Sequence, residues 1–344
     1  MKTIAYGNNN PQGKIEKITI DRRAPQSTDV VIKIAYCGIC HSDIHTARGD
    51  WGDVAYPCVP GHEIIGEVVQ IGEAVKNHKV GDLVGVGCMV NSCRTCEKCI
   101  SGNENYCNNV VWTYASLDPI DGTDTKGGYS ETIVVDQDFV IAIPEGMDSA
   151  KTAPLLCAGI TMYSPLKHWG AQAGKRVGII GLGGLGHMGI KLAKALGAEV
   201  YAITTSPEKA TVAKAYGAAG VIVSTDAQSM KNSVQTFDLL IDTAPDRHDI
   251  KAYIELLKFD GSLVFVGPIA TDFEFGASDI MANRRSLAGS GIGSIAETKE
   301  MLAFCKEHAI YPDIEVISPE RINDAWEQMI NKKMDHRYVI DFSK

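Results

Sequence analysis

Excess positive charge is missing from this sequence, and so are long hydrophobic runs. The 344 residues include 33 lysines and arginines against 42 aspartates and glutamates, which gives a formal net charge of −9. Nucleic-acid-binding proteins usually present a basic surface, so we expect no nucleic-acid partner. No apolar stretch approaches the roughly 18–20 residues that cross a bilayer, and the N-terminal residues lack an apolar signal core. We therefore expect neither secretion nor membrane insertion, and a cytoplasmic location.

Cysteine is also sparse, with ten residues in all, but its distribution is uneven. The number is too small for a disulfide scaffold, and clustered cysteines in a cytosolic chain are typical of metal or redox chemistry. Cys93, Cys96, Cys99 and Cys107 lie in one polar, loop-like stretch. Four thiolates can close a tetrahedron around zinc with no position left for a substrate, which predicts a structural zinc site. An iron–sulfur cluster, whose usual spacings differ, and disulfides are the alternatives.

The pattern of strands and helices changes near residue 150. Because one hydrophobic core seldom grows past about 250–300 residues, we expect two domains. The first part has short β-branched runs separated by turns, which indicates a small β-barrel, and the second alternates strands with helices, which indicates a doubly wound parallel α/β sheet. We place the domains at residues 1–152 and 153–294, with a tail at 295–344 that returns to the first domain. In the α/β region we expect strands at 176–180, 199–204, 221–223, 237–242, 262–266 and 287–290, and helices at 184–196, 208–216 and 250–259.

A glycine-rich segment follows the first expected strand of the α/β region. Gly181, Leu182, Gly183, Gly184, Leu185 and Gly186 come directly after the buried run 177–180 and open a helix. A strand before and a helix after make this motif typical of dinucleotide binding. Gly181 permits the tight turn, Gly183 lets the backbone approach the pyrophosphate, and Gly186 lets helix and sheet pack closely. A flexible glycine loop without a ligand is the alternative.

The end of the next strand indicates which dinucleotide would bind. An acidic residue about 20 positions after the glycine motif would bind the ribose hydroxyls of NAD. This window instead holds Thr204, Thr205 and Ser206, followed by Lys209. Three hydroxyl donors and a cation suit a 2′-phosphate, so we expect NADP(H) rather than NAD(H). Lys209 as a solvated helix residue is the alternative.

A second metal site is suggested by cysteine and histidine residues outside the four-cysteine cluster. Cys40, His62 and Cys157 are candidate ligands. Two thiolates and one imidazole would leave the fourth zinc position open, which is the catalytic arrangement. The spacing alone does not select Cys40 over Cys37, and it does not show that Cys157 reaches the same point.

These motifs occur together in one order that resembles the zinc-dependent medium-chain alcohol dehydrogenases. The resemblance rests on Gly61-His62-Glu63, the four-cysteine stretch, the glycine motif and the segment 155–159, and it covers essentially the whole chain. Segments 37–45, 153–165 and 289–302 are similar to the cinnamyl alcohol dehydrogenase-like branch of that family. The resemblance implies a GroES-like β-barrel catalytic domain, a Rossmann domain, one catalytic and one structural Zn²⁺ per chain, and a homodimer paired through 286–290.

The resemblance also assigns roles to individual residues. Cys40, His62 and Cys157 match the catalytic zinc ligands, and Glu63 matches a carboxylate that can approach the metal. Asp43 matches the partner that orients His62, and Ser42 and His45 match a proton relay. Further cofactor contacts would come from Thr161, Val266, Gly267, Ser290, Gly291 and Ile292. Trp112 matches an aromatic residue that lines the substrate pocket, and we expect Trp51 to face the same cleft; plain packing is the alternative for both. Cys37, Cys58, Cys88 and Cys305 remain, and we expect them to be small buried hydrophobic residues.

The activity that the resemblance implies is the NADP(H)-dependent interconversion of aldehydes and primary alcohols. Where plant members of the branch usually carry phenylalanine after Gly289-Ser290, this chain has Gly291, so we expect broad use of aromatic and medium aliphatic aldehydes. A polyol or secondary-alcohol dehydrogenase of the same superfamily is one alternative. A non-catalytic nucleotide-binding sensor is another, although a sensor has no need of the relay residues.

Overall fold

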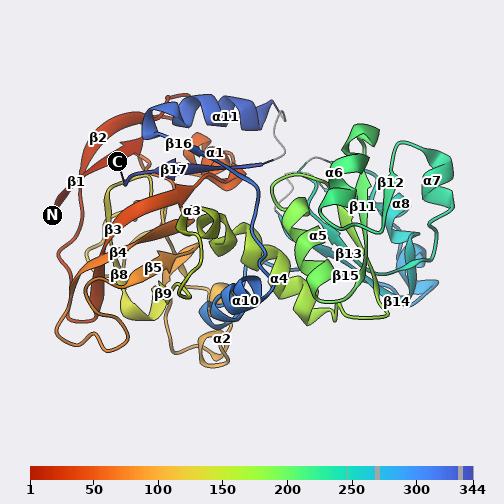
Figure 1. Cartoon of the computed structure of the whole chain (residues 1–344), viewed down its shortest axis with the longest axis horizontal. Helices are drawn as coiled ribbons and strands as arrows, with labels where there is room; N and C mark the ends of the chain where they lie inside the picture. Colours follow the sequence, from red (N-terminus) through yellow and green to blue (C-terminus); the bar gives the residue numbers. More distant parts are fainter. Residues whose placement is uncertain (246, 268–271, 332–335, 344) are drawn as a thin grey trace. The chain divides into compact units, whose positions relative to one another are not determined.

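The computed structural model describes residues 1–245, 247–267, 272–331 and 336–343. The chain divides into two compact units, and each is described by itself (Figure 1). The first comprises Met1–Cys157, Ser294–Lys306 and Tyr311–Lys344, and the second comprises Ala158–Gly293 and Glu307–Ile310. The sequence placed the first boundary at 152/153. In the structure, the fully buried turn η3 (Ala153–Leu156) packs against strands of the first unit, so the chain leaves that unit only after Cys157.

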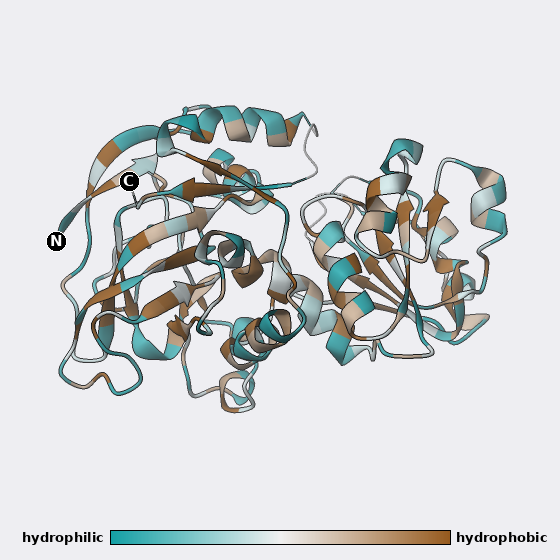
Figure 2. Ribbon diagram, in the orientation of Figure 1, coloured by the Kyte–Doolittle hydropathy of each residue, from teal (hydrophilic) through white to brown (hydrophobic). Residues whose placement is uncertain are grey.

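The main sheet of the first unit joins strands from both ends of the chain. Its order is β16 (Ile314–Ile317), β17 (Arg337–Asp341), β3 (Asp29–Gly38), β4 (Ile64–Ile71), β5 (Leu83–Val86) and β9 (Ile141–Ala142), and β8 (Thr132–Asp136) also pairs with β3. β17 runs antiparallel to β3, with Val339 opposite Gly38. The central strands are rich in isoleucine and valine, and the ribbon is mostly hydrophobic there (Figure 2). The C-terminal segment is therefore part of the first unit's core.

Shorter elements surround this sheet. β1 (Lys2–Gly7) pairs with β2 (Glu16–Asp21), and β6 (Met89–Asn91) pairs with β7 (Val111–Trp112). The helices and turns of this unit are α1 (His41–Arg48), α2 (Glu97–Ile100), η1 (Glu104–Tyr106), η2 (Gln137–Phe139), α3 (Ser149–Thr152), α10 (Ile295–Glu307), η5 (Pro319–Arg321) and α11 (Ile322–Ile330). Two of them matter most for the sites below. The candidate ligand Cys40 is the N-cap residue of α1, and α2 and η1 lie within the four-cysteine stretch.

The second unit contains the doubly wound parallel sheet that the sequence predicted. Its order is β12 (Gly220–Val223), β11 (Glu199–Thr204), β10 (Arg176–Ile180), β13 (Phe237–Asp242), β14 (Leu257–Phe265) and β15 (Ser286–Gly289), with parallel pairing throughout. β10 comes first in the sequence but lies inside the sheet, so the winding direction reverses beside it. In such sheets the ligand crevice lies at the carboxyl ends of the strands at this point of reversal.

The helices of the second unit are α4 (Ala158–His168), α5 (Gly186–Ala195), η4 (Pro207–Lys209), α6 (Ala210–Ala215), α7 (Ala227–Lys231), α8 (Ile250–Ile254) and α9 (Ala277–Met281). The helix expected over 250–259 was wrong at its end, because α8 stops at Ile254 and β14 begins at Leu257. Leu257 pairs with Phe237 across the parallel sheet, so tertiary pairing overrides the local helical pattern. Within the described ranges, no helix is both long and apolar enough to cross a membrane.

Candidate active site

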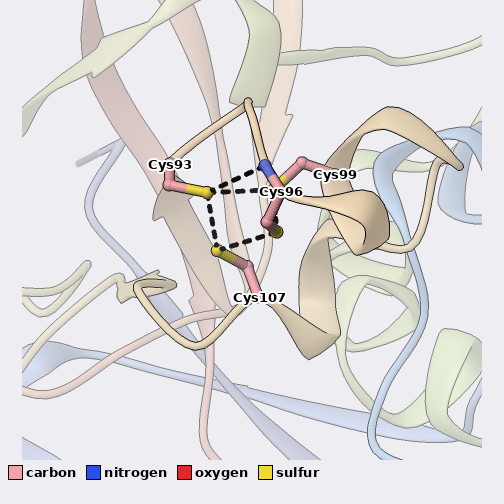
Figure 3. Close-up of side chains that lie close together, drawn as sticks. All are labelled: Cys93, Cys96, Cys99 and Cys107. Carbon is pink, nitrogen blue, oxygen red and sulfur yellow. Dashed lines mark hydrogen bonds between the residues drawn. The ribbon is translucent and has the colours of Figure 1, made fainter.

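The four cysteines of the polar stretch converge on one point (Figure 3). The sulfur–sulfur distances are 3.4 Å for Cys93–Cys107, 3.5 Å for Cys96–Cys99, 3.8 Å for Cys96–Cys107 and 3.9 Å for Cys93–Cys99. Four thiolates at 2.3 Å from a tetrahedral zinc would be about 3.8 Å apart, so the donor set fits this metal. The cysteines are free thiols rather than disulfides. Hydrogen bonds from the backbone amides of Thr95 and Cys96 lower the pKa of Cys93 to about 6, which favours the thiolate form.

A second group brings together Cys40, His62, Glu63 and Cys157. One donor atom from each lies within 4.8 Å of the others, and all four residues are buried. Cys40 precedes α1, His62 and Glu63 precede β4, and Cys157 follows η3, so three separate segments of the first unit build the site. The structure resolves the choice that spacing left open, since Cys37 lies within β3 and outside this group.

Asp43 holds these segments in place. Its carboxylate is fully buried and accepts hydrogen bonds from the backbone amides of Cys40 (2.8 Å) and Gly61 (3.0 Å) and from the hydroxyl of Tyr129 (3.2 Å). It also lies 3.0 Å from Nδ1 of His62. A carboxylate on Nδ1 keeps the proton there and leaves Nε2 as the lone-pair donor that a metal requires. The carboxylate of Asp43 is therefore in a position to orient His62, which is the role that the family resemblance predicts for it.

The two thiols of this group have opposite pKa shifts. A hydrogen bond from Cys157, supported by His62, holds the pKa of Cys40 well below its ordinary value. The same bond raises the pKa of Cys157 well above its ordinary value. The shift at Cys40 favours its thiolate form, which is the form that binds a metal. Two sulfur donors and one imidazole at this separation fit a zinc ion with an open fourth position.

Glu63 is paired with a residue that the sequence did not reveal. Its carboxylate forms a buried ion pair with the guanidinium of Arg337 on β17. Burial raises the pKa of Glu63 to about 7, although the charge of Arg337 acts in the opposite direction. Gly38 makes room for this carboxylate, because a Cβ there would lie 1.9 Å from Oε2 of Glu63. No sequence motif points to Arg337, which lies 274 residues from Glu63.

The remaining cysteines only partly match the expectation of burial. Cys37, Cys58 and Cys305 are buried, and burial raises the pKa of both Cys58 and Cys305 to about 12. Cys88 is only half-buried, and its thiol interacts with Cys157. The expectation for Cys88 was therefore wrong. It lies between β5 and β6, and the contact of its thiol with Cys157 places it beside a candidate metal ligand.

The relay residues lie on α1. Ser42 Oγ is 3.6 Å from the sulfur of Cys40, and His45 lies one helical turn further along. His45 is partly exposed, with its Nδ1 2.8 Å from Asp50 Oδ2 and its ring stacked on Trp51 at a centroid distance of 5.1 Å. Asp50 therefore holds the His45 ring at Nδ1, and Trp51 packs against its face. Sequence reasoning missed Asp50. Trp112, at the end of β7, is also partly exposed.

The glycine motif has the geometry of a dinucleotide loop. Gly181 has a φ of +88°, and a Cβ at Gly186 would lie 2.0 Å from the carbonyl oxygen of Gly181. A Cβ at Gly183 would meet nothing within 4 Å, so this part of the loop is open. α5 begins at Gly186, the last residue of the motif, and the start of a helix directly after such a loop suits a pyrophosphate.

The residues expected to select NADP(H) have different environments. Lys209 extends to the glycine loop, where its Nζ donates to the carbonyl of Leu182 at 3.0 Å. Thr204 is buried and its Oγ1 accepts the amide of Ser206, so Thr204 shapes the turn. Thr205 is exposed. Of the four residues, Thr205, Ser206 and Lys209 are at least partly accessible to solvent.

The other expected cofactor contacts also lie in the second unit. Thr161 is buried on α4, Val266 and Gly267 follow β14, and Ser290, Gly291 and Ile292 follow β15. Ile292 has a φ of +44°, which is rare for a β-branched residue. Backbone strain of this kind is often found where a ligand binds.

Fold and sites together define a zinc-binding dehydrogenase. Residues 26–145 match the alcohol dehydrogenase GroES-like domain, and residues 184–307 match the zinc-binding dehydrogenase family. The chain belongs to this zinc-binding alcohol dehydrogenase family, as the sequence resemblance indicated.

Close relatives extend over nearly the whole chain. The aldehyde reductase YahK of Escherichia coli is 48% identical over 343 residues, covering 99% of this chain and 98% of the relative. A probable cinnamyl alcohol dehydrogenase of Populus deltoides is 45% identical, covering 99% and 96%. Among solved structures, a cinnamyl alcohol dehydrogenase of Sorghum bicolor has a TM-score of 0.96 at 42% identity, covering 99% and 98%. One from Helicobacter pylori, complexed with NADP(H), has a TM-score of 0.95 at 39% identity, covering 100% and 99%.

Proposed function

We propose that this protein is an NADP(H)-dependent alcohol dehydrogenase and aldehyde reductase, acting on aromatic and medium aliphatic aldehydes and the corresponding primary alcohols. The observation that carries this proposal is the buried group of Cys40, His62 and Cys157, with Asp43 fixing the imidazole. Two thiolates and one imidazole are the ligand set that leaves a zinc position open for substrate. Cys93, Cys96, Cys99 and Cys107 would hold a second, structural Zn²⁺.

Each residue near this group has a task that follows from its contacts. When bound, the zinc would polarise a carbonyl and a reduced nicotinamide would supply hydride. Asp43 keeps the His62 proton on Nδ1. Ser42 Oγ, beside Cys40, would pass a proton to the reduced product and regain one that enters from solvent through His45, and the path would reverse for alcohol oxidation. His45 exchanges protons with solvent because its ring is partly exposed and an imidazole can both donate and accept a proton. Asp50 holds His45 Nδ1.

The cofactor preference is proposed from Lys209. Its amine extends over the glycine loop to Leu182, and Thr205 and Ser206 lie at the end of the neighbouring strand. A cation and two hydroxyl groups there would bind a 2′-phosphate, and no carboxylate stands where the ribose of NAD would need one. The Helicobacter pylori relative, whose structure holds NADP(H), supports this preference.

The substrate range is proposed to be broad. Trp51 and Trp112 are partly exposed aromatic side chains that can contact an aromatic substrate, and Gly291 has no side chain that would narrow the range of substrates. Two further proposals concern the whole molecule. We propose a cytoplasmic homodimer in which β15 (Ser286–Gly289), at the edge of its sheet, pairs with the same strand of a second copy.

A substrate and cofactor panel tests the function. We expect benzaldehyde and medium aliphatic aldehydes to oxidise NADPH, measured at the nicotinamide absorbance band, with NADH much less effective and sorbitol inactive in the reverse direction. Turnover of sorbitol in preference to benzaldehyde would indicate a polyol dehydrogenase. No oxidation of NADPH by any aldehyde would overturn the proposal and favour a nucleotide-binding sensor.

The Lys209→Met variant tests the cofactor site. Losing a charge-assisted contact to the 2′-phosphate should lower kcat/KM for NADPH by roughly ten- to a hundredfold and leave NADH nearly unchanged. Lys214→Met, at an exposed position on α6, is the matched control and should behave as wild type. Equal losses with NADPH and NADH would contradict the assignment of Lys209 to the phosphate.

A further inference from the structure

Glu104 connects the four-cysteine stretch to the start of α10. It lies in η1, between Cys99 and Cys107, and its Oε1 accepts the backbone amide of Ile295 at 2.7 Å. Ile295 is the first residue of α10. The amides of a helix's first turn have no partner within the helix, and a carboxylate there is favoured by both hydrogen bonding and the helix dipole.

This contact is added to a cap that the helix already has. The amide of Ser294 donates to Glu297 Oε2 at 3.0 Å, and the amide of Glu297 donates to Ser294 Oγ at 3.2 Å. Such a reciprocal pair is a capping box and needs no help from elsewhere in the chain. Glu104 comes from 191 residues earlier and so fixes where the helix begins relative to the four-cysteine stretch.

The residues immediately before this helix are strained. Ile292 has a φ of +44°, and a β-branched residue adopts this conformation only where its surroundings impose it. On its N-terminal side, the amide of Ser290 is held by the carbonyl of Phe265 at 2.9 Å. On its C-terminal side, Ser294 is held by the capping box and Ile295 by Glu104. The segment 290–293 is therefore held at both ends, and Glu104 supplies part of the second anchor.

We propose that Glu104 is a positioning residue for the cofactor: by holding the start of α10, it keeps Ser290–Ile292 in the conformation that borders the nicotinamide. This inference rests on the proposed function, which places the cofactor beside these residues. It also gives the four-cysteine site a role beyond local folding. Cys107 directly follows η1, so closing that site sets the position of Glu104.

Amide hydrogen exchange and NADPH binding in three variants test the inference. Glu104→Ala removes the acceptor, and Glu104→Gln keeps a neutral acceptor oxygen at the same place. Glu97→Ala removes an equal charge from an exposed position on α2 in the same stretch and is the matched control. In Glu104→Ala we expect exchange of the amides at 292–297 to accelerate roughly tenfold and the Kd for NADPH, from fluorescence titration, to rise by a similar factor. Glu104→Gln should stay within about threefold of wild type, with Glu97→Ala unchanged and the zinc content equal in all four proteins.

The outcomes separate this inference from the proposed function. Wild-type protein that binds neither NADPH nor NADH would overturn both. Normal binding by the wild type with unchanged exchange at 292–297 in Glu104→Ala would overturn the inference alone. Faster exchange with an unchanged Kd would overturn it as well, because Glu104 would then only stabilise the helix. Equal effects in Glu97→Ala would show that charge in the stretch, and not the contact with Ile295, is responsible.

Discussion

Replacing Asp43 by asparagine should lower kcat/KM for aldehyde reduction by about ten- to a hundredfold, together with the zinc affinity of the Cys40 site. The reason lies in the partners of the carboxylate. The amides of Cys40 and Gly61, the Tyr129 hydroxyl and His62 Nδ1 meet the two carboxylate oxygens. In either orientation, the NH₂ group of asparagine faces a backbone amide, of Cys40 or of Gly61, that has no acceptor to offer. The neutral side chain therefore holds His62 and its Nδ1 proton less firmly.

Steady-state kinetics and metal analysis of Asp43→Asn measure this effect. Asp53→Asn makes the same change at an exposed carboxylate nearby in the sequence and should retain wild-type values. If Asp43→Asn matched Asp53→Asn in both activity and zinc content, Asp43 would not be what holds His62 in place.

Replacing Arg337 by methionine should reduce the free energy of unfolding by about 3–5 kcal/mol. The variant would leave Glu63 buried without its cation, and the pKa of Glu63 is already raised to about 7 by burial with Arg337 present. The double variant Glu63→Gln with Arg337→Met leaves no unpaired charge. We therefore expect it to regain most of the lost stability, as seen for other buried ion pairs.

Denaturant unfolding of the two single variants and the double variant checks this prediction. Arg321→Met is the matched control, because Arg321 pairs with Glu315 at 3.1 Å where both side chains are exposed. Exposed pairs contribute at most about 1 kcal/mol. The prediction would be contradicted if Arg337→Met lost as little free energy of unfolding as Arg321→Met, or if the double variant recovered none of the loss. The buried pair would then contribute no more to stability than an exposed one.

Features formed by neighbouring residues were predictable from the sequence. The glycine motif follows its strand directly, and the four cysteines lie within one short stretch, so local spacing carried both assignments. The parallel sheet was also predictable, since alternating strands and helices have few other solutions. The helix at 250–259 failed because Leu257 pairs with Phe237 in the sheet, and local periodicity does not report such pairing.

Features that depend on distant segments were not predictable from the residues alone. Cys40, His62 and Cys157 come from three segments, and only the family resemblance selected Cys40 over Cys37. Arg337 and Glu104 each make one contact across much of the chain, with Glu63 and Ile295, and have no motif of their own. Cys88 looked like a core cysteine, and only the fold places it beside Cys157.

Stepwise removal of zinc from the wild-type protein tests the central claim most directly. Zinc per chain would be counted by mass spectrometry while benzaldehyde-dependent oxidation of NADPH is followed on the same samples. We expect two zinc ions per chain in the active protein, one for each group of donors. Activity should fall to zero as the count drops from two to one, because a site with three protein ligands releases its metal before a closed four-cysteine site. Full activity at one zinc per chain would contradict the account.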